Sequence, residues 1–270
     1  MTLSSVFCVL LLGVLEGITE WLPVSSTGHL LLLGDRLPLS MRPEFRELFD
    51  VAIQLGAILA VLILYRRELN PFSRNDDTSR RLWGRILLAV LPSAAVGLLL
   101  EDWIYAYLFN SVTVALALIL WGIALMLSER SLKKKAPAVR SPEELSCKRA
   151  SVIGLWQTLS LIPGTSRSGA TILGAQLVGC SRECAARFSF FLAIPTMLGA
   201  SLLKGVGFLS EGNLPTSEEV ILLSLGASVA FLVSLVSLRF LTDYVRRHGF
   251  FAFGVYRILL GSLVLFDRFF

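Results

Sequence analysis

Long apolar stretches alternate with short charged clusters along the whole chain, and this pattern constrains the fold more than any other feature. Hydrophobic residues make up 54% of the sequence and charged residues only 17%, too few charges for the polar surface of a soluble domain. A helix needs about 20 apolar residues to cross a bilayer. Six stretches of about that length occur, near residues 48–65, 84–101, 111–128, 187–206, 219–238 and 250–267. The sequence therefore predicts an all-α integral membrane protein with six transmembrane helices, in a single membrane domain over residues 1–270.

Two further apolar units are interrupted by polar motifs. The first covers residues 3–33 and breaks at Pro23, and the second covers residues 150–178 and breaks at Pro163-Gly164. The helix after the first break is too short to cross about 30 Å of hydrocarbon. A broken backbone survives at membrane depth only where protein or a wet cavity satisfies its polar groups. We therefore predict two re-entrant helix pairs beside the six spans.

The two halves of the chain repeat: the shift that aligns Ser25 with Ser166 also brings the two breaking prolines to within one position. Residues 1–128 form the first repeat and residues 150–270 the second, joined by the basic loop 129–149. Each half holds one re-entrant pair and three spans, so the second half enters from the opposite face. The pattern predicts an inverted-topology repeat, whose site lies near the midplane where the broken helices meet.

The net charge of +5 comes from basic residues that lie between spans. Six spans place loops 66–85, 129–149 and 239–249 on one side, and these are rich in Lys and Arg. Loops 102–110 and 207–218 fall on the other side and contain neither. Cytoplasmic loops carry the positive excess, so the basic loops are predicted to be cytoplasmic and the first re-entrant pair to lie toward the outside. This explains the basic balance without nucleic acid as a partner.

Two carboxylates precede the first break. Glu16 and Glu20 are spaced i,i+4 and share one helix face. A charge at bilayer depth costs about 2.5–3.5 kcal/mol, and two like charges add repulsion. Either one carboxylate is protonated or a cation lies between them. The hydroxyl residues Ser25, Ser26 and Thr27 follow the break, where a helix N-terminus with free N–H groups binds anions.

The second break carries one arginine among hydroxyl residues. Arg167 lies between Ser166 and Ser168. The planar guanidinium fork suits phosphate oxygens, so the functional interpretation is a phosphate site. The alternative is that Arg167 only pairs with Glu16 or Glu20.

His29 completes the set, because it closely follows the hydroxyl cluster. Carboxylates, a histidine, hydroxyls and an arginine from two broken helices are the parts needed for phosphoryl transfer. Spacing alone does not separate hydrolysis from transport of an anion. Two other polar residues in apolar surroundings are interpreted differently: Arg257 as structural, and Asp50 as a supporting acid or a charge favoured by the helix dipole.

The motifs GVLEGITEWLPVSSTGH and PGTSRSGATI resemble the signatures of the undecaprenyl-diphosphate phosphatase family of the bacitracin-resistance type. FDVAIQLGAILA and FSFFLAIPTMLGA extend the resemblance over essentially the whole chain. It implies a divalent-metal-dependent enzyme of the bacterial inner membrane, with its site facing the periplasm. The implied reaction converts undecaprenyl diphosphate to undecaprenyl phosphate, which recycles the lipid carrier of cell-wall synthesis.

The resemblance also assigns roles to residues. Ser26 becomes the nucleophile or a phosphate ligand, and Glu16 and Glu20 become ligands of Mg²⁺ or Ca²⁺. The catalytic set is Glu16, Glu20, Ser26, His29 and Arg167. The substrate-binding set is Ser25, Thr27, Ser166, Ser168, Gly169 and Thr171. Expected partners are the polyprenyl diphosphate and membrane lipids, with a homodimer left open. The alternative function is a transporter or flippase for the carrier lipid.

Overall fold

The computed structural model describes residues 3–33, 37, 41–72, 77–132 and 136–269, and within these ranges the chain is helical apart from turns and one isolated β-bridge. The lysines at 133–135 of the predicted basic loop lie outside the described residues. The elements in chain order are α1 (Leu3–Thr19), α2 (Ser26–Leu33), α3 (Pro43–Ala52), α4 (Gln54–Leu64), α5 (Arg66–Leu69), α6 (Asp77–Leu108), α7 (Ser111–Leu132), η2 (Pro142–Glu144), α8 (Cys147–Thr158), η3 (Leu159–Leu161), α9 (Arg167–Leu177), α10 (Arg182–Ser210), α11 (Ser217–His248) and α12 (Phe251–Phe269).

Five helical stretches in the described part of the chain are long and apolar enough to cross a membrane. They run over Pro43–Leu64, Asp77–Leu108, Ser111–Ser131, Arg182–Ser210 and Ser217–His248. The predicted all-α, multi-spanning membrane class is therefore confirmed. The sixth predicted span, at 250–267, coincides with α12, which is not among these five and carries Arg257 in its middle.

Both predicted breaks are present, and both contain an unusual backbone conformation. Helix α1 ends at Thr19 and α2 begins at Ser26, while η3 ends at Leu161 and α9 begins at Arg167. Ser25 has a φ of 70° and Ser166 a φ of 71°, and no other described residue except glycine has a positive φ. Such a conformation costs about 1–3 kcal/mol for a residue with a Cβ and is concentrated at functional sites.

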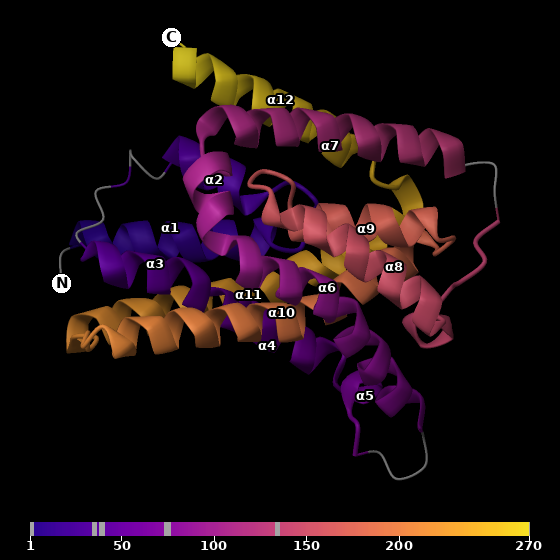
Figure 1. Cartoon of the computed structure of the whole chain (residues 1–270), viewed down its shortest axis with the longest axis horizontal. Coiled ribbons are helices and arrows are strands. Elements are labelled where there is room, and N and C mark those ends of the chain that lie inside the picture. Colours follow the sequence, from indigo (N-terminus) through magenta and orange to yellow (C-terminus); the bar gives the residue numbers. More distant parts are fainter. Residues whose placement is uncertain (1–2, 34–36, 38–40, 73–76, 133–135, 270) are drawn as a thin grey trace.

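The elements of the two halves pack across one another (Figure 1). Helix α1 lies against α11, and α8 lies against α6. Glycines permit both contacts: a Cβ on Gly13 would lie 2.8 Å from the carbonyl oxygen of Gly226, and one on Gly154 would lie 2.2 Å from that of Ala89. Small residues let membrane helices approach closely. Helices α7 and α12 form a third pair along one side of the molecule.

The two breaks are held next to each other inside this bundle. Trp21, in the first break, is fully buried and packs edge-on against Phe190 of α10, with ring centroids 5.5 Å apart. Just after the second break, in the first turn of α9, Ser168 donates a hydrogen bond to the carbonyl oxygen of Leu22 at 3.1 Å. The polar motifs of the two halves therefore meet in the interior.

Candidate active site

A cavity of about 230 Å³ lies between the two breaks. Both motifs contribute to its wall, and α4 and α10 close the remaining sides. The lining residues are Thr19, Glu20, Ser25, Ser26, Thr27, Gln54, Ser160, Pro163, Gly164, Ser166, Arg167, Thr196, Met197 and Ala200. Six of the predicted site residues therefore share one cavity, although they come from opposite halves of the chain.

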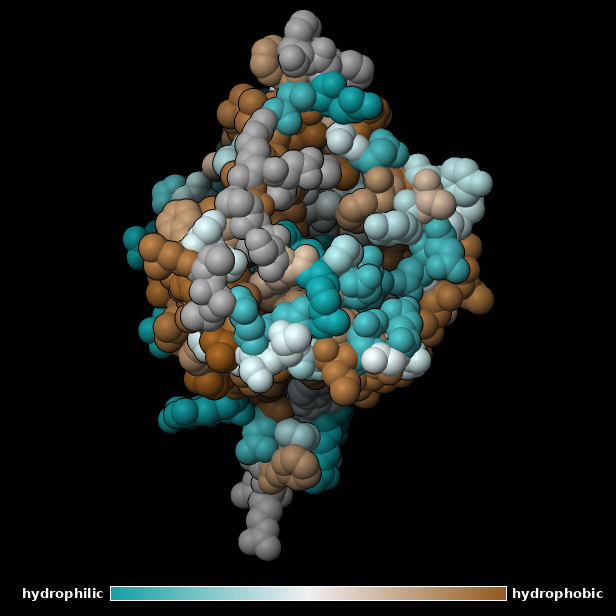
Figure 2. All heavy atoms as spheres, turned by 90° about the vertical axis from the view of Figure 1, so that its left-hand side faces the viewer, coloured by the Kyte–Doolittle hydropathy of each residue, from teal (hydrophilic) through white to brown (hydrophobic). Residues whose placement is uncertain are grey.

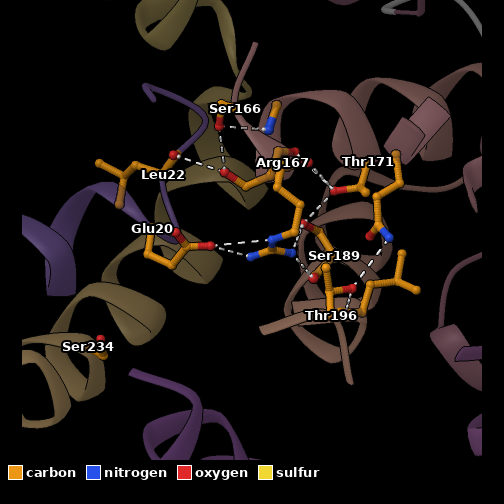
Figure 3. A network of polar contacts seen from close by, with 12 residues as sticks. Glu20, Leu22, Ser166, Arg167, Thr171, Ser189, Thr196 and Ser234 are labelled. Carbon is orange, nitrogen blue, oxygen red and sulfur yellow. Dashed lines mark hydrogen bonds and ion pairs between the residues drawn. The ribbon is translucent and has the colours of Figure 1, made fainter. Parts of the chain in front are cut away.

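An ion pair between residues of the two breaks forms part of the wall of this cavity. Arg167 Nη2 lies 2.8 Å from Glu20 Oε1, and Arg167 Nε donates to the same oxygen at 3.3 Å. Arg167 Nη1 donates to the carbonyl oxygen of Ser189 at 2.6 Å. Figure 3 shows the two side chains pointing toward one another from opposite breaks. The pairing considered as the alternative role of Arg167 therefore exists, and it lies inside the wall of a cavity.

Glu16 lies one helical turn before Glu20, and its carboxylate is incompletely satisfied. The residue is only 4% exposed, and its Oε1 has no hydrogen-bond partner. The charges of Glu20, Asp50 and Arg167 all act on it. A buried carboxylate oxygen without a donor is costly, so this position favours an added proton or cation.

The hydroxyl residues divide into two groups. Ser25, Ser26 and Thr27 line the cavity at the N-terminus of α2. Ser166 also lines it, and its Oγ caps α9 by accepting from the N–H of Gly169 at 3.2 Å. These four are placed where an anion in the cavity would meet hydroxyl and backbone donors.

The other predicted substrate-binding residues lie behind the cavity wall. Ser168 is 1% exposed and is bound to Leu22, as described above. Thr171 is fully buried. Its hydroxyl oxygen lies 2.9 Å from the carbonyl oxygen of Arg167 and 2.7 Å from Ser189 Oγ. Gly169 is buried in the first turn of α9. Ser168 joins the two breaks and Thr171 bonds to Arg167 and Ser189, and none of the three residues lines the cavity.

His29 points away from the cavity, toward α12. Its Nδ1 lies 2.7 Å from the carbonyl oxygen of Ser25, and its Nε2 lies 2.6 Å from the hydroxyl of Tyr256. A carbonyl oxygen only accepts, so Nδ1 carries the proton and, in the neutral ring, Nε2 accepts from Tyr256. In this arrangement His29 holds Ser25, the residue with the positive φ.

Six polar residues at the site lie outside the predicted set. Ser189 binds Arg167, Tyr256 binds His29, and four line the cavity: Thr19, Gln54, Ser160 and Thr196. Four of the six lie inside the motifs quoted for the family resemblance, which is the signal that could have found them: Thr19, Gln54, Ser189 and Thr196. No spacing signal distinguishes such a residue from one that bonds back to its own helix, and Thr196 does also donate to the carbonyl oxygen of Leu192 at 2.8 Å.

A larger groove of about 940 Å³ continues from the cavity between α3, α6 and α10. The two share Thr27, Ser160, Pro163, Thr196 and Ala200. Much of the groove wall is apolar, and its lining also includes four acids, Glu44, Glu47, Glu101 and Glu211, two of which pair with Lys204. Figure 2 views this end of the molecule, where hydrophilic residues gather beside a hollow and the flanks are hydrophobic. The polar cavity therefore adjoins a groove whose wall is largely apolar.

Comparison with known proteins gives one consistent result. The family model described as bacitracin resistance protein BacA matches residues 9–263. The chain is 46% identical to the undecaprenyl-diphosphatase of Enterococcus faecalis, over 98% of each protein. It is 49% identical to that of Streptococcus thermophilus, over 94% of this chain and 90% of the relative. It is 49% identical to that of Acetivibrio thermocellus, over 94% of each.

Proposed function

Because the chain belongs to the bacitracin resistance protein BacA family, we propose that it hydrolyses undecaprenyl diphosphate to undecaprenyl phosphate and inorganic phosphate. The membership confirms the resemblance found in the two motifs. The observation that carries the proposal is the cavity in which Glu20, Ser26 and Arg167 meet from two broken helices. The apolar groove beside it has the character that a prenyl chain requires.

Arg167 binds the terminal phosphate in this proposal. Its guanidinium presents a donor fork that fits two phosphate oxygens, and in the structure part of that fork is taken by Glu20. An entering phosphate exchanges with the carboxylate, while Ser189 O keeps Nη1 in place. The N–H groups at the start of α2 add donors from the other break.

Ser26 is the proposed nucleophile. Its Oγ attacks the terminal phosphorus, the bond from that phosphorus to the bridging oxygen breaks, and the lipid phosphate leaves with that oxygen. Water then cleaves the phosphoserine and releases inorganic phosphate. Glu20 shares the cavity with Ser26 and is the base that accepts the serine proton, whereas His29 bonds to Ser25 and Tyr256 outside the cavity wall. In the alternative, an activated water attacks directly and Ser26 is only a ligand.

A divalent cation fits the two carboxylates at the end of α1 and just after it. Glu16 and Glu20 offer oxygen ligands one turn apart, and Glu16 Oε1 lacks a partner. No cluster of three His, Cys, Asp or Glu side chains suited to a metal occurs among the described residues. The protein would thus supply two ligands and leave the rest to water and the diphosphate, as is common for Mg²⁺. When bound, Mg²⁺ or Ca²⁺ would screen the charge of the diphosphate.

The finer topology also belongs to this proposal. We assign α12 as the sixth span and the α1–α2 and α8–α9 units as re-entrant pairs of an inverted repeat. Supporting this, Ser25 and Ser166 align in the internal repeat and share their positive φ. In this proposal the open end of the groove lies on the periplasmic side of the inner membrane, and the charge of the loops supports that orientation.

Release of phosphate from undecaprenyl diphosphate by the detergent-purified protein tests the function. We expect release that EDTA abolishes, and that Glu20→Gln abolishes. Arg182→Gln is the control, because Arg182 pairs with Glu129 away from the cavity lining. A carrier-lipid transporter would release no phosphate, so a folded wild type that is inactive with every divalent metal would overturn the proposal.

Trapping of phosphate separates the two forms of the mechanism. Rapid quenching with labelled substrate should place phosphate on Ser26. Full turnover by Ser26→Ala would leave only the form in which water attacks directly.

A further inference from the structure

Arg257 is a fully buried arginine outside the cavity, in the middle of α12. Its guanidinium bonds only to backbone carbonyl oxygens, and no carboxylate pairs with it among the described residues. The partners are Leu118 O at 3.4 Å, Pro23 O at 3.2 Å, Gly164 O at 2.8 Å and Thr165 O at 2.9 Å. A cation at this depth without an anionic partner is expensive and marks function by default.

Three of these four carbonyls belong to the breaks. Pro23 lies in the first, and Gly164 and Thr165 lie in the second. Breaking a helix at membrane depth leaves carbonyl groups without helical partners, and each unsatisfied group is costly there. One side chain thus satisfies carbonyls from both motifs and fixes the distance between them.

The neighbouring residue on α12 supports the first break from another side. Tyr256 binds His29, which in turn binds the carbonyl oxygen of Ser25. Tyr256 and Arg257 together therefore connect α12 to carbonyls on either side of Val24. Ser25 and Gly164, whose carbonyls are held in this way, both line the cavity.

The charge of Arg257 also reaches the site. An arginine side chain stays protonated in proteins, even when buried. Gly164 separates the guanidinium from the cavity by a single residue, and Nη1 lies 3.2 Å from the position of a Cβ on Gly169, in the first turn of α9. Backbone dipoles do not cancel a full charge, so an anion in the cavity lies in the field of Arg257 as well as of Arg167.

We propose that Arg257 is a positioning residue for the phosphatase reaction, which holds the two breaks in register and adds positive charge behind the diphosphate. The inference rests on the proposed function for its reaction. The proposal differs from the interpretation of Arg257 as merely structural. Substitution of a merely structural arginine would change neither the affinity of the cavity for an anion nor the alignment of the reacting groups.

Two substitutions separate the two parts of this role. Arg257→Lys keeps the charge but loses the fork that reaches four carbonyls. We expect its kcat to fall about 100-fold, as for a misplacement of about 1 Å, with the affinity for a diphosphate retained. Arg257→Gln loses the charge as well, so its affinity should also fall about tenfold. The matched controls, Arg182→Lys and Arg182→Gln, change an arginine that bonds Glu129 and lines neither cavity.

The experiment measures kcat with undecaprenyl diphosphate and, separately, the dissociation constant of methylenediphosphonate by calorimetry in detergent. Support requires weaker diphosphonate binding in Arg257→Gln than in Arg257→Lys, with both Arg182 controls like the wild type. Wild-type binding and kcat in a folded Arg257→Gln protein would overturn the proposal. If that variant does not fold, Arg257→Lys decides, since an unchanged kcat there refutes positioning. An inactive wild type would reject the proposed phosphatase function. It would not decide the role of Arg257, because the dissociation constant of methylenediphosphonate tests the effect of the Arg257 charge without any turnover.

Discussion

The Glu20–Arg167 pair joins the two breaks, and removing one partner alone should destabilise the protein. The side chains are only 9% and 10% exposed. Arg167→Ala leaves the Glu20 carboxylate buried without its cation, which costs about 3–5 kcal/mol. Glu20→Gln should cost less, about 1–3 kcal/mol, because the glutamine oxygen still accepts from Arg167, which also keeps its bond to Ser189.

The stability of the double variant relative to Arg167→Ala tests whether the unpaired Glu20 carboxylate causes the loss. Combining Glu20→Gln with Arg167→Ala removes both charges, so the double variant should be more stable than Arg167→Ala by about 2 kcal/mol. For a chain of this size, 1 kcal/mol corresponds to about 2–4 °C in Tm. We therefore expect Arg167→Ala to lower Tm by about 6–20 °C and the second substitution to restore about 4–8 °C.

Tryptophan fluorescence during heating in detergent measures these four proteins under identical conditions. The cycle of Glu129→Gln and Arg182→Ala provides a comparison at a second pair, in which Glu129 is buried, Arg182 is 32% exposed and the paired atoms lie 2.5 Å apart. A double variant no more stable than Arg167→Ala would refute the reasoning, because it would show that the unpaired Glu20 carboxylate is not the source of the loss.

Three further predictions concern the helix contact, the strained backbone and the metal. Gly154→Ala should lower Tm, at a cost of about 1–3 kcal/mol, because its Cβ would lie 2.2 Å from Ala89 O; Gly84→Ala, which has open space around it, should not. Ser166→Gly should be about 1 kcal/mol more stable than Ser166→Ala in the same thermal assay, since both lose the hydroxyl that caps Gly169 but only glycine accepts a φ of 71° without strain; equal stabilities would contradict this. Glu16→Gln should raise the Mg²⁺ concentration for half-maximal phosphate release about tenfold, and an unchanged Mg²⁺ titration would exclude Glu16 as a ligand.

The sequence was sufficient to find the breaks and the residues that meet between them. Helix-length apolar runs and proline positions report local backbone requirements, so the breaks near Pro23 and Pro163 could be predicted. The predicted internal repeat aligned Ser25 with Ser166, and these two residues have nearly equal φ values of 70° and 71°. Neither the positive φ nor its cost is visible in a serine as such.

The direction of each side chain could not be predicted in the same way. His29 and Thr27 are close neighbours on one short helix, yet Thr27 lines the cavity and His29 bonds to α12. Which face of a short helix meets the cavity depends on how α2 packs against α7 and α12, and those contacts join residues far apart in sequence. For the same reason the role of Arg257 was missed, since its partners come from α7 and both breaks.

A structure of the protein with a non-hydrolysable methylenediphosphonate analogue of the prenyl substrate would show directly whether the cavity between the two breaks is the active site. We expect the terminal phosphonate to lie between the two breaks, bonded to Arg167 with the contact between Arg167 and Glu20 released. The prenyl chain should lie in the groove between α3, α6 and α10. A diphosphonate bound elsewhere, with the Glu20–Arg167 pair intact, would contradict the assignment of this cavity as the active site.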